Sequence, residues 1–385
     1  MDTIIIINSS NFPFGYASVE KIKLLTKGLN NQNWKTYVLN MFSNLAEKEY
    51  SQLKPIGKYE KTIYIYSSLI SFKIKKASKL KLFFQSMIRE IFIIKKLFNH
   101  KKSKVIVFQY GSFLLLVWYF ILSRFFRANF YINTMEYHIA IKNSLNARLF
   151  DKYSYFFSDG VIVISKFLEK LVKQRFPKHK TLVLPVTVDF NMFGKYDGKI
   201  HDYSLFCASA GHIRVFKYVI NAFNYVDNKN HQLVLVGNGK AAEMDLLRNA
   251  ISKSPYTNRI KLYSNLDYNS LILKYQQAKL LLIPMYNDER DMARFPHKIG
   301  EYTASKRPIL LTPIGDSTLY FQDNVSAFFS RDTSESSFGH KMNNVLKDDK
   351  LLNKVGEAGF NIGIESFDYL KQGEILSKYF KDKNI

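Results

Sequence analysis

A regular alternation of short apolar runs and amphipathic stretches constrains the fold of this chain more than any other feature. Apolar runs such as Thr3–Ile7 are typical of buried strands, and stretches such as Ser18–Leu29 have the spacing of amphipathic helices. Strands and helices that alternate in this way favour a parallel sheet with helices on both of its faces. The sequence therefore predicts an α/β fold of the doubly wound kind.

The alternation occurs twice, which indicates two domains of similar size. The first series of expected strands is Thr3–Ile7, Thr36–Leu39, Val105–Phe108, Asn129–Thr134, Gly160–Ser165 and Thr181–Leu184. The second series is Ser204–Ala208, His231–Val236, Arg259–Leu262, Leu280–Pro284 and Pro308–Thr312. Between the two, from Asp189 to Tyr203, the chain becomes polar, charged and glycine-bearing, as linkers do. We expect Rossmann-like domains at residues 1–190 and 200–365, and a last helix within residues 366–385 that packs back across the junction.

Composition and the start of the chain narrow the class of protein. A hydrophobic content of 47% is that of a globular protein with full cores. The single cysteine, Cys207, excludes an internal disulfide framework and a cysteine metal cluster, and it suits a reducing cytoplasm. The start lacks the features of a signal peptide, and the apolar segment Ser112–Ser123 is short for a bilayer span. We expect a cytoplasmic protein in which Ser112–Ser123 is a buried helix.

The charge of the chain is strongly basic and unevenly spread. The net charge is +24, and the segment Lys73–Lys104 holds eleven Lys or Arg residues against one acid, Glu90. Such an excess is typical of proteins that meet nucleic acid, an anionic membrane or a phosphorylated substrate. Because Leu80, Phe84 and other apolar residues interleave with the lysines, we favour an interfacial helix on anionic lipid over a merely solvated helix face.

The stretch that says most about function follows the expected strand Leu280–Pro284. After a polar loop, Arg294–Pro296 should begin a helix, since proline is well tolerated at a first helical position. Lys298 and Glu301 are three residues apart on that helix, so they share a face near its positive end. A cation and a helix N-terminus suit a diphosphate, and a carboxylate beyond them suits the hydroxyls of a ribose. The stretch therefore predicts a nucleotide-sugar site.

Two turns of the first domain carry further candidate residues. Gly15 precedes the first helix, where backbone N–H groups can contact an acceptor or a donor phosphate; an ordinary strand-to-helix turn is the alternative. His138 follows the strand Asn129–Thr134, at the edge where ligands of open α/β sheets bind. It can hydrogen-bond a sugar hydroxyl or a developing charge, or it can be structural, and Glu136 is the weaker candidate beside it.

Two turns of the second domain carry candidates as well. Gly211 permits close backbone approach, and Arg214 or Lys217 can pair with phosphate oxygens; a solvated basic turn is the alternative. Val236–Ala242 matches the G-x-G-x-x-A fingerprint, but it follows an internal strand, and the next strand ends without an acid. We therefore interpret Gly237 as part of a turn close to a nucleotide, not as an NAD site. The sequence shows no Asp-x-Asp pair, zinc-spaced cluster or Walker loop, which favours chemistry without a metal cofactor.

Taken in order, these motifs resemble those of the retaining glycosyltransferases of family 4, of the bacterial surface-polysaccharide type. The resemblance runs along most of the chain, and each motif is modest alone, whereas five in order are specific. They are Phe12–Gly15, Asp159–Ser165 with Leu184–Phe193, Arg214 before Val219–Phe223, Val236–Gly239 and Pro296–Tyr302. The resemblance implies the GT-B fold, in which two Rossmann-like domains face each other across a cleft.

The chain departs from the family pattern at particular positions. The family commonly carries two glutamates, of which the second matches Glu301, while Ala293 stands where the first would be. The acids of the adjoining loop that could replace it are Asp288, Glu289 and Asp291. The usual glycine–arginine pair that begins the second domain is replaced around Gly211, so the phosphate clamp would rely on Arg214.

The resemblance implies transfer of a sugar from a nucleoside diphosphate to an acceptor hydroxyl with retention of configuration. Glu301 would hold the ribose, while Arg214 and Lys298 would offset the charge that grows on the departing diphosphate. No residue presents itself as a covalent nucleophile, so substitution on one face, with the leaving phosphate as base, is the expected mechanism. The acceptor would be a growing or lipid-linked glycan at the inner face of a bacterial membrane, as in capsule or O-antigen assembly.

The expected site residues form two sets, and no cofactor or metal is expected besides the nucleotide-sugar donor. The catalytic set is His138, Arg214 and Lys298. The donor-binding set is Glu301, Gly15, Gly211, Lys217, Gly237, Phe295, Pro296 and Asp291. Two other functions fit less well. A nucleic-acid binder would explain the charge but shows no known module, and a sugar-nucleotide 2-epimerase of the same fold would need no acceptor.

Overall fold

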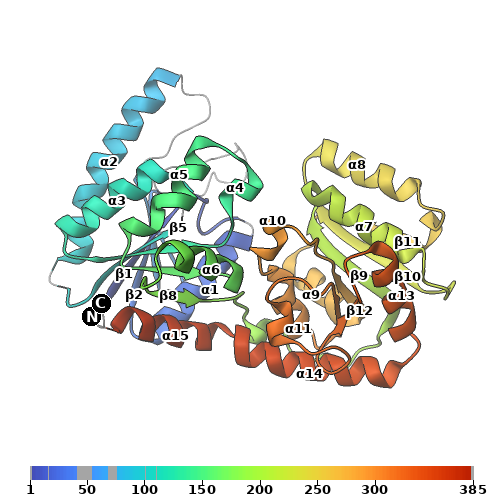
Figure 1. Cartoon of the computed structure of the whole chain (residues 1–385). Coiled ribbons are helices and arrows are strands. Elements are labelled where there is room, and N and C mark those ends of the chain that lie inside the picture. The colour runs from blue at the N-terminus through green and yellow to red at the C-terminus, as the bar shows by residue number, and fades with distance from the viewer. Residues whose placement is uncertain are drawn as a thin grey trace. The chain divides into compact units, whose positions relative to one another are not determined.

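The computed structural model of the chain describes residues 2–15, 17–40, 54–67, 76–99, 101–109 and 111–382. The chain forms two compact units, one made of Met1–Thr187 with Tyr369–Ile385 and the other of Val188–Asp368. Each unit holds a mainly parallel sheet with helices packed against it (Figure 1). The predicted α/β fold with two Rossmann-like domains is confirmed.

The first unit is built on a sheet whose strands lie in the order β3-β4-β2-β1-β5-β6-β7-β8. The strands are β1 (Thr3–Asn8), β2 (Lys35–Asn40), β3 (Ile56–Tyr59), β4 (Thr62–Tyr66), β5 (Lys104–Gln109), β6 (Asn129–Thr134), β7 (Gly160–Val163) and β8 (Thr181–Val183). Neighbouring strands are parallel except β3 and β4, which form an antiparallel hairpin. The central strand β1 is buried along its whole length, as its unbroken apolar run predicts.

Helices cover this sheet, and one of them comes from the far end of the chain. They are α1 (Ala17–Asn31), α2 (Lys76–Phe98), α3 (Phe113–Phe125), α4 (His138–Ile141), α5 (Leu145–Tyr153), α6 (Lys166–Arg175) and α15 (Tyr369–Lys381). The last helix, α15, packs on α1 (Figure 1). A Cβ atom on Gly28 would lie 2.4 Å from the carbonyl oxygen of Tyr369, so the two helix backbones approach closely only because glycine is there.

The second unit is built on a parallel sheet in the order β11-β10-β9-β12-β13-β14. Its strands are β9 (His201–Ser209), β10 (Gln232–Asn238), β11 (Ile260–Tyr263), β12 (Ala278–Ile283), β13 (Ile309–Leu311) and β14 (Phe328–Phe329). Its helices are α7 (Ile213–Phe223), α8 (Ala241–Ser252), α9 (Tyr268–Gln277), α10 (Glu289–Met292), α11 (His297–Ala304), α12 (Ser317–Tyr320), α13 (Glu335–Val345) and α14 (Asp349–Phe367). The carboxyl ends of β9, β10 and β12 lie next to one another, which brings three separate turns of the sequence to one edge.

Every predicted strand is found, and the described part of the chain holds three further strands that were not predicted: β3, β4 and β14. β3 is largely exposed and β14 has only two residues, so neither stands out as an apolar run, whereas β4 is an apolar run that was overlooked. The predicted last helix is found as α15, which begins at Tyr369 because Asp368 has an extended backbone (φ −64°, ψ 134°) after α14.

The apolar segment Ser112–Ser123 forms α3, and only one of its faces is buried. Leu116 and Tyr119 are fully buried against the sheet, whereas Leu114 is 80% exposed and Phe125 is 73% exposed. The expectation of a buried helix is therefore wrong for the outer face. Among the described residues, no helix is both long enough and apolar enough to cross a membrane.

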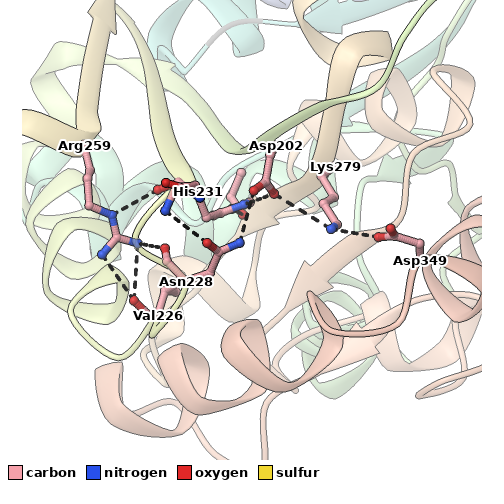
Figure 2. Close-up of polar contacts among 9 residues, drawn as sticks. Asp202, Val226, Asn228, His231, Arg259, Lys279 and Asp349 are labelled. Carbon is pink, nitrogen blue, oxygen red and sulfur yellow. Dashed lines mark hydrogen bonds and ion pairs between the residues drawn. The ribbon is translucent and has the colours of Figure 1, made fainter.

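A polar network ties together the amino ends of the strands in the second unit (Figure 2). The His231 ring is fully buried; its Nδ1 lies 2.6 Å from Asp202 Oδ1, and its Nε2 lies 2.9 Å from Ser204 Oγ. The Arg259 guanidinium donates to the carbonyl oxygens of Val226, Asn228 and His231. Lys279 lies 2.7 Å from Asp349 and 3.8 Å from Asp202. The network satisfies buried polar groups at the edge opposite to the three turns.

Within this network, His231 is the group through which the stability of the second unit should depend on pH. Burial lowers the pKa of His231 below its usual 6.5. The Asp202 carboxylate acts in the opposite direction because it favours the charged ring, whereas the positive charges of Lys279 and Arg259 lower the pKa further. The unfolded chain therefore binds a proton that the folded unit does not, and the free energy of unfolding should fall as the pH drops below about 6.5. We expect His231→Gln to flatten the dependence of the urea midpoint on pH between 7.5 and 5. An unchanged slope would show that His231 is not the titrating group.

Candidate nucleotide-sugar site

Lys298 and Glu301 lie on one face of α11, the helix that follows β12 and its polar loop. Lys298 Nζ is 2.6 Å from Glu301 Oε2, as the three-residue spacing predicts. The side chains are 27% and 16% exposed. Burial alone would lower the pKa of Lys298, but the neighbouring Glu301 carboxylate outweighs it and raises this pKa. The two groups therefore form a charged pair at the carboxyl end of the sheet.

Phe295 and Pro296 set the start of α11. The sequence predicts that Pro296 occupies the first helical position. The helix instead begins at His297, and Pro296 is the residue before it. Phe295 is buried, with its ring centroid 5.3 Å from that of Tyr320 and 5.5 Å from that of Phe367. These two residues anchor the helix in the core, which fixes the direction in which Lys298 and Glu301 project.

The loop before α11 uses its acids to hold its own backbone. Asp291 is buried; its Oδ2 accepts from the Tyr286 N–H at 2.8 Å, and its Oδ1 pairs with Arg294. Asp288 caps α10 by accepting from the Asp291 N–H at 2.9 Å. Glu289 is exposed, and Ala293, where a second carboxylate was expected, is fully buried.

Arg214 reaches from the turn after β9 to this loop. Its guanidinium lies 3.4 Å from the centroid of the Tyr286 ring, and its Nη1 donates to Asp288 Oδ2 at 3.1 Å. The Arg214 side chain remains 64% exposed. The structure thus brings Arg214 to the loop that leads into α11, whereas Lys217, one turn further along α7, is simply exposed.

The two glycines of the second unit differ in their surroundings. Gly211 is exposed on the turn after β9, where a Cβ atom would meet Glu243 at 3.3 Å. Gly237 is buried, and a Cβ atom there would lie 3.1 Å from Phe216 and 3.2 Å from Leu247. Packing against α7 and α8 is thus sufficient to explain why Gly237 has no side chain.

His138 lines a cavity of about 320 Å³ in the first unit, at the carboxyl ends of β1, β5 and β6. Most of the lining groups are amides, hydroxyls and one carboxylate: Asn8, Ser9, Ser10, Ser18, Gln109, Asn133, Thr134 and Glu136. The amide Nδ2 of Asn133 donates to Gln109, while its buried Oδ1 has no partner in the described part of the chain. Gly15 lies outside the described lining and packs against Val19 instead.

Asp151 fixes the orientation of His138, and sequence reasoning missed it. His138 Nδ1 lies 2.8 Å from Asp151 Oδ1, and the Ile139 N–H donates to Asp151 Oδ2 at 2.8 Å. Because a carboxylate only accepts, Nδ1 carries a proton, and in the neutral ring Nε2 is then the acceptor. Asp151 is buried on α5, within a segment whose pattern is that of an ordinary amphipathic helix, so no sequence signal marks it.

Comparison with known proteins finds a family that matches most of the second unit. Residues 201–362, which run from β9 into α14, match the family Glycosyl transferases group 1. The matched region, which is called the group 1 domain below, contains Gly211, Arg214, Gly237, Lys298 and Glu301. Over this region the match agrees with the predicted resemblance to family 4, while the surface-polysaccharide type remains a prediction.

Solved structures give the same fold for the whole chain. Sucrose-phosphate synthase of Thermosynechococcus elongatus matches with a TM-score of 0.79 at 13% identity, over 99% of this chain and 98% of that chain. HepE of Anabaena, in complex with UDP and glucose, matches with a TM-score of 0.74 at 13% identity, over 98% and 99%. A glycosyltransferase of Rickettsia africae matches with a TM-score of 0.69 at 14% identity, over 100% and 99%. These likenesses establish the GT-B fold; a comparison with curated protein sequences finds no match.

Proposed function

We propose that this protein is a glycosyltransferase that moves a sugar from a nucleoside diphosphate to a hydroxyl of a growing or lipid-linked glycan, with retention of configuration. The observation that carries the proposal is the Lys298–Glu301 pair on α11, at the carboxyl end of β12 in the group 1 domain. A partly buried carboxylate at that edge suits the two hydroxyls of a ribose, because a carboxylate accepts from both.

Arg214 is the cation that we propose for the diphosphate. Its guanidinium is exposed beside the loop that leads into α11, and a planar guanidinium matches phosphate oxygens well. As the bond to the sugar breaks, negative charge grows on the diphosphate, and a fixed cation stabilises that state most. We propose that this cation replaces a metal, so turnover should persist in EDTA. Among the possible donors, UDP-sugars are the first to test, since the HepE structure of the same fold was solved with UDP-glucose.

The cavity beside His138 is the site that we propose for the acceptor. Its amides, hydroxyls and Glu136 carboxylate suit a ligand with several hydroxyl groups, and the buried Asn133 Oδ1 requires a donor. His138 Nε2, held as an acceptor by Asp151, can take a hydrogen bond from a sugar hydroxyl. These features support a glycan acceptor.

We propose that α2 holds the enzyme on the cytoplasmic face of a bacterial membrane, where a lipid-linked acceptor resides. Part of the basic segment Lys73–Lys104, including Lys73 and Lys75, lies outside the described residues. On the described face of α2, Phe84, Ile88 and Phe92 form an apolar stripe and are 55%, 58% and 66% exposed. Exposed cations flank the stripe: Lys81, Arg89, Lys95 and Lys96. Glu90 turns inward instead and accepts from Ser67 and Tyr119, both at 2.8 Å. An apolar stripe with basic flanks suits an anionic lipid surface.

Replacing Phe84 and Phe92 together by serine should therefore weaken binding to phosphatidylglycerol vesicles by about tenfold or more, since each buried aromatic contributes roughly 1.5–3 kcal/mol. Co-sedimentation measures the binding. Leu246→Ser, which removes a 54% exposed apolar side chain from α8, is the matched control. Equal binding of the double variant and the wild type would show that α2 does not meet the membrane.

The donor proposal is tested by thermal shift with UDP-, GDP- and ADP-sugars on the wild type and on Glu301→Ala. A ligand that binds only the folded state raises the melting temperature, so one of the three should stabilise the wild type and not the variant. If none stabilises the wild type, or if Glu301→Ala responds equally, the proposal is wrong. Product analysis without an acceptor separates transfer from epimerisation, and binding to arbitrary DNA without turnover would favour a nucleic-acid binder.

A further inference from the structure

The ammonium group of Lys298 is already surrounded by polar atoms of its own domain. Its Nζ donates to Glu301 Oε2 at 2.6 Å and to the Tyr275 hydroxyl at 2.8 Å. An ammonium group has three protons to donate, and these two neighbours accept two of them.

The protonation states of the cluster support this arrangement. Burial strongly raises the pKa of Tyr275, so its phenol is neutral and its oxygen can accept from Lys298. Lys298 keeps its charge because the Glu301 carboxylate raises its pKa. The result is a cation held between a neutral acceptor in the core and a carboxylate at the edge of the sheet.

Tyr275 is a rigid anchor for this cation. It is fully buried on α9, and its ring meets that of Tyr302 edge-on, with centroids 5.0 Å apart. The Tyr302 hydroxyl in turn accepts from the backbone N–H of Cys207 at 3.1 Å. Elements α9, α11 and β9 are thus tied together directly beneath the Lys298–Glu301 pair.

We infer that Lys298 and Tyr275 are positioning residues that orient Glu301 for the ribose, and that Lys298 does not bind the diphosphate as its spacing suggested. This inference rests on the proposed nucleotide-sugar function. Lys298 holds Oε2 of the carboxylate, while Oε1 has no hydrogen-bond partner in the described part of the chain. Fixing one oxygen limits the rotation of the carboxylate, which prepares the other oxygen to accept from a ribose hydroxyl.

The two roles of Lys298 predict different ligand dependence. If Lys298 acts through Glu301, Lys298→Met weakens binding of a nucleoside and of its diphosphate by the same factor, roughly tenfold for a lost charge-assisted interaction. If it contacts phosphate, only the diphosphate is affected. Calorimetric titration with UDP and uridine, GDP and guanosine, and ADP and adenosine measures both factors. In a Glu301→Gln background, the effect of Lys298→Met should largely disappear, since the group that it positions is altered.

Tyr275→Phe provides a second, smaller perturbation of the Tyr275–Lys298–Glu301 arrangement. It should raise the KM for the donor several-fold with little change in kcat, because it loosens the anchor of Lys298 and leaves every group that contacts the donor in place. Tyr203→Phe is the matched control: its buried hydroxyl also bonds α9, at the Lys274 carbonyl 2.7 Å away, but does not touch Lys298.

The outcomes separate this inference from the proposed function. Wild type that binds none of the three diphosphates contradicts the proposed function itself. If the wild type binds one of them, two results would overturn the positioning role alone. One is a loss of affinity in Lys298→Met that is confined to the diphosphate. The other is a KM for the donor in Tyr275→Phe that equals the KM in Tyr203→Phe. Circular dichroism and melting temperatures show whether each variant is folded. If Lys298→Met does not fold, Tyr275→Phe decides.

Discussion

Glu301→Ala is expected to lower kcat/KM for the nucleotide-sugar donor by on the order of a hundredfold or more. A carboxylate that accepts from two ribose hydroxyls makes two charge-assisted hydrogen bonds, each of about 1.5–3 kcal/mol. Its removal also leaves the partly buried Lys298 ammonium without the carboxylate that raises its pKa. Initial rates at varied donor concentration, with the product quantified by chromatography, measure the loss.

The control for this variant is Glu357→Ala. Glu357 is also paired with a lysine of the same unit, Lys306 at 3.3 Å, but both side chains are about half exposed. An exposed ion pair of this kind contributes little to the free energy of unfolding, so both the stability and the turnover of Glu357→Ala should stay near those of the wild type. If Glu301→Ala retained the activity of Glu357→Ala, the ribose would have to be held elsewhere, and the assignment of the site would fail.

Arg214→Ala is expected to reduce kcat by about 10²–10³-fold, the usual cost of removing a fixed group that stabilises developing negative charge. The effect on donor affinity should be smaller, because the interaction strengthens as charge moves onto the leaving diphosphate. Single-turnover kinetics with saturating donor isolates this step.

Arg248→Ala is the matched control for Arg214→Ala. Both arginines lie on helices of the group 1 domain, both are paired with an aspartate, and their side chains are 62% and 64% exposed. Only Arg214 reaches the loop that leads into α11. Equal kcat values for the two variants would contradict a role for Arg214 in the transition state, and an unchanged kcat with a raised KM would indicate binding of the ground state alone.

Much of the fold could be predicted because its signals are local. A strand buried on both faces is a short apolar run whatever surrounds it, so the central strands of both sheets were found. The pairing of Lys298 with Glu301 was predictable for the same reason, since residues three apart on a helix share a face. Two of the strands that were not predicted lack this signal, since β3 is largely exposed and β14 has only two residues, whereas β4 carries it and was overlooked.

The rest of the candidate site depends on contacts between distant segments. Arg214 meets Asp288, 74 positions further along the chain, and Tyr275 meets Lys298, 23 positions further on. No periodicity of the sequence links such pairs. Asp291 is an example: its place in the loop predicts a donor ligand, yet its carboxylate accepts from the Tyr286 N–H and pairs with Arg294.

The sequence by itself determined the doubly wound architecture and the presence of a carboxylate and a cation on one helix after β12. The tertiary structure decided what these groups face. It placed Tyr275 beneath Lys298, set Asp151 behind His138 and buried Ala293 in the core. The physical reason is that helix and strand patterns follow from neighbours in the chain, whereas the orientation of a charged side chain follows from whichever distant groups satisfy its hydrogen bonds.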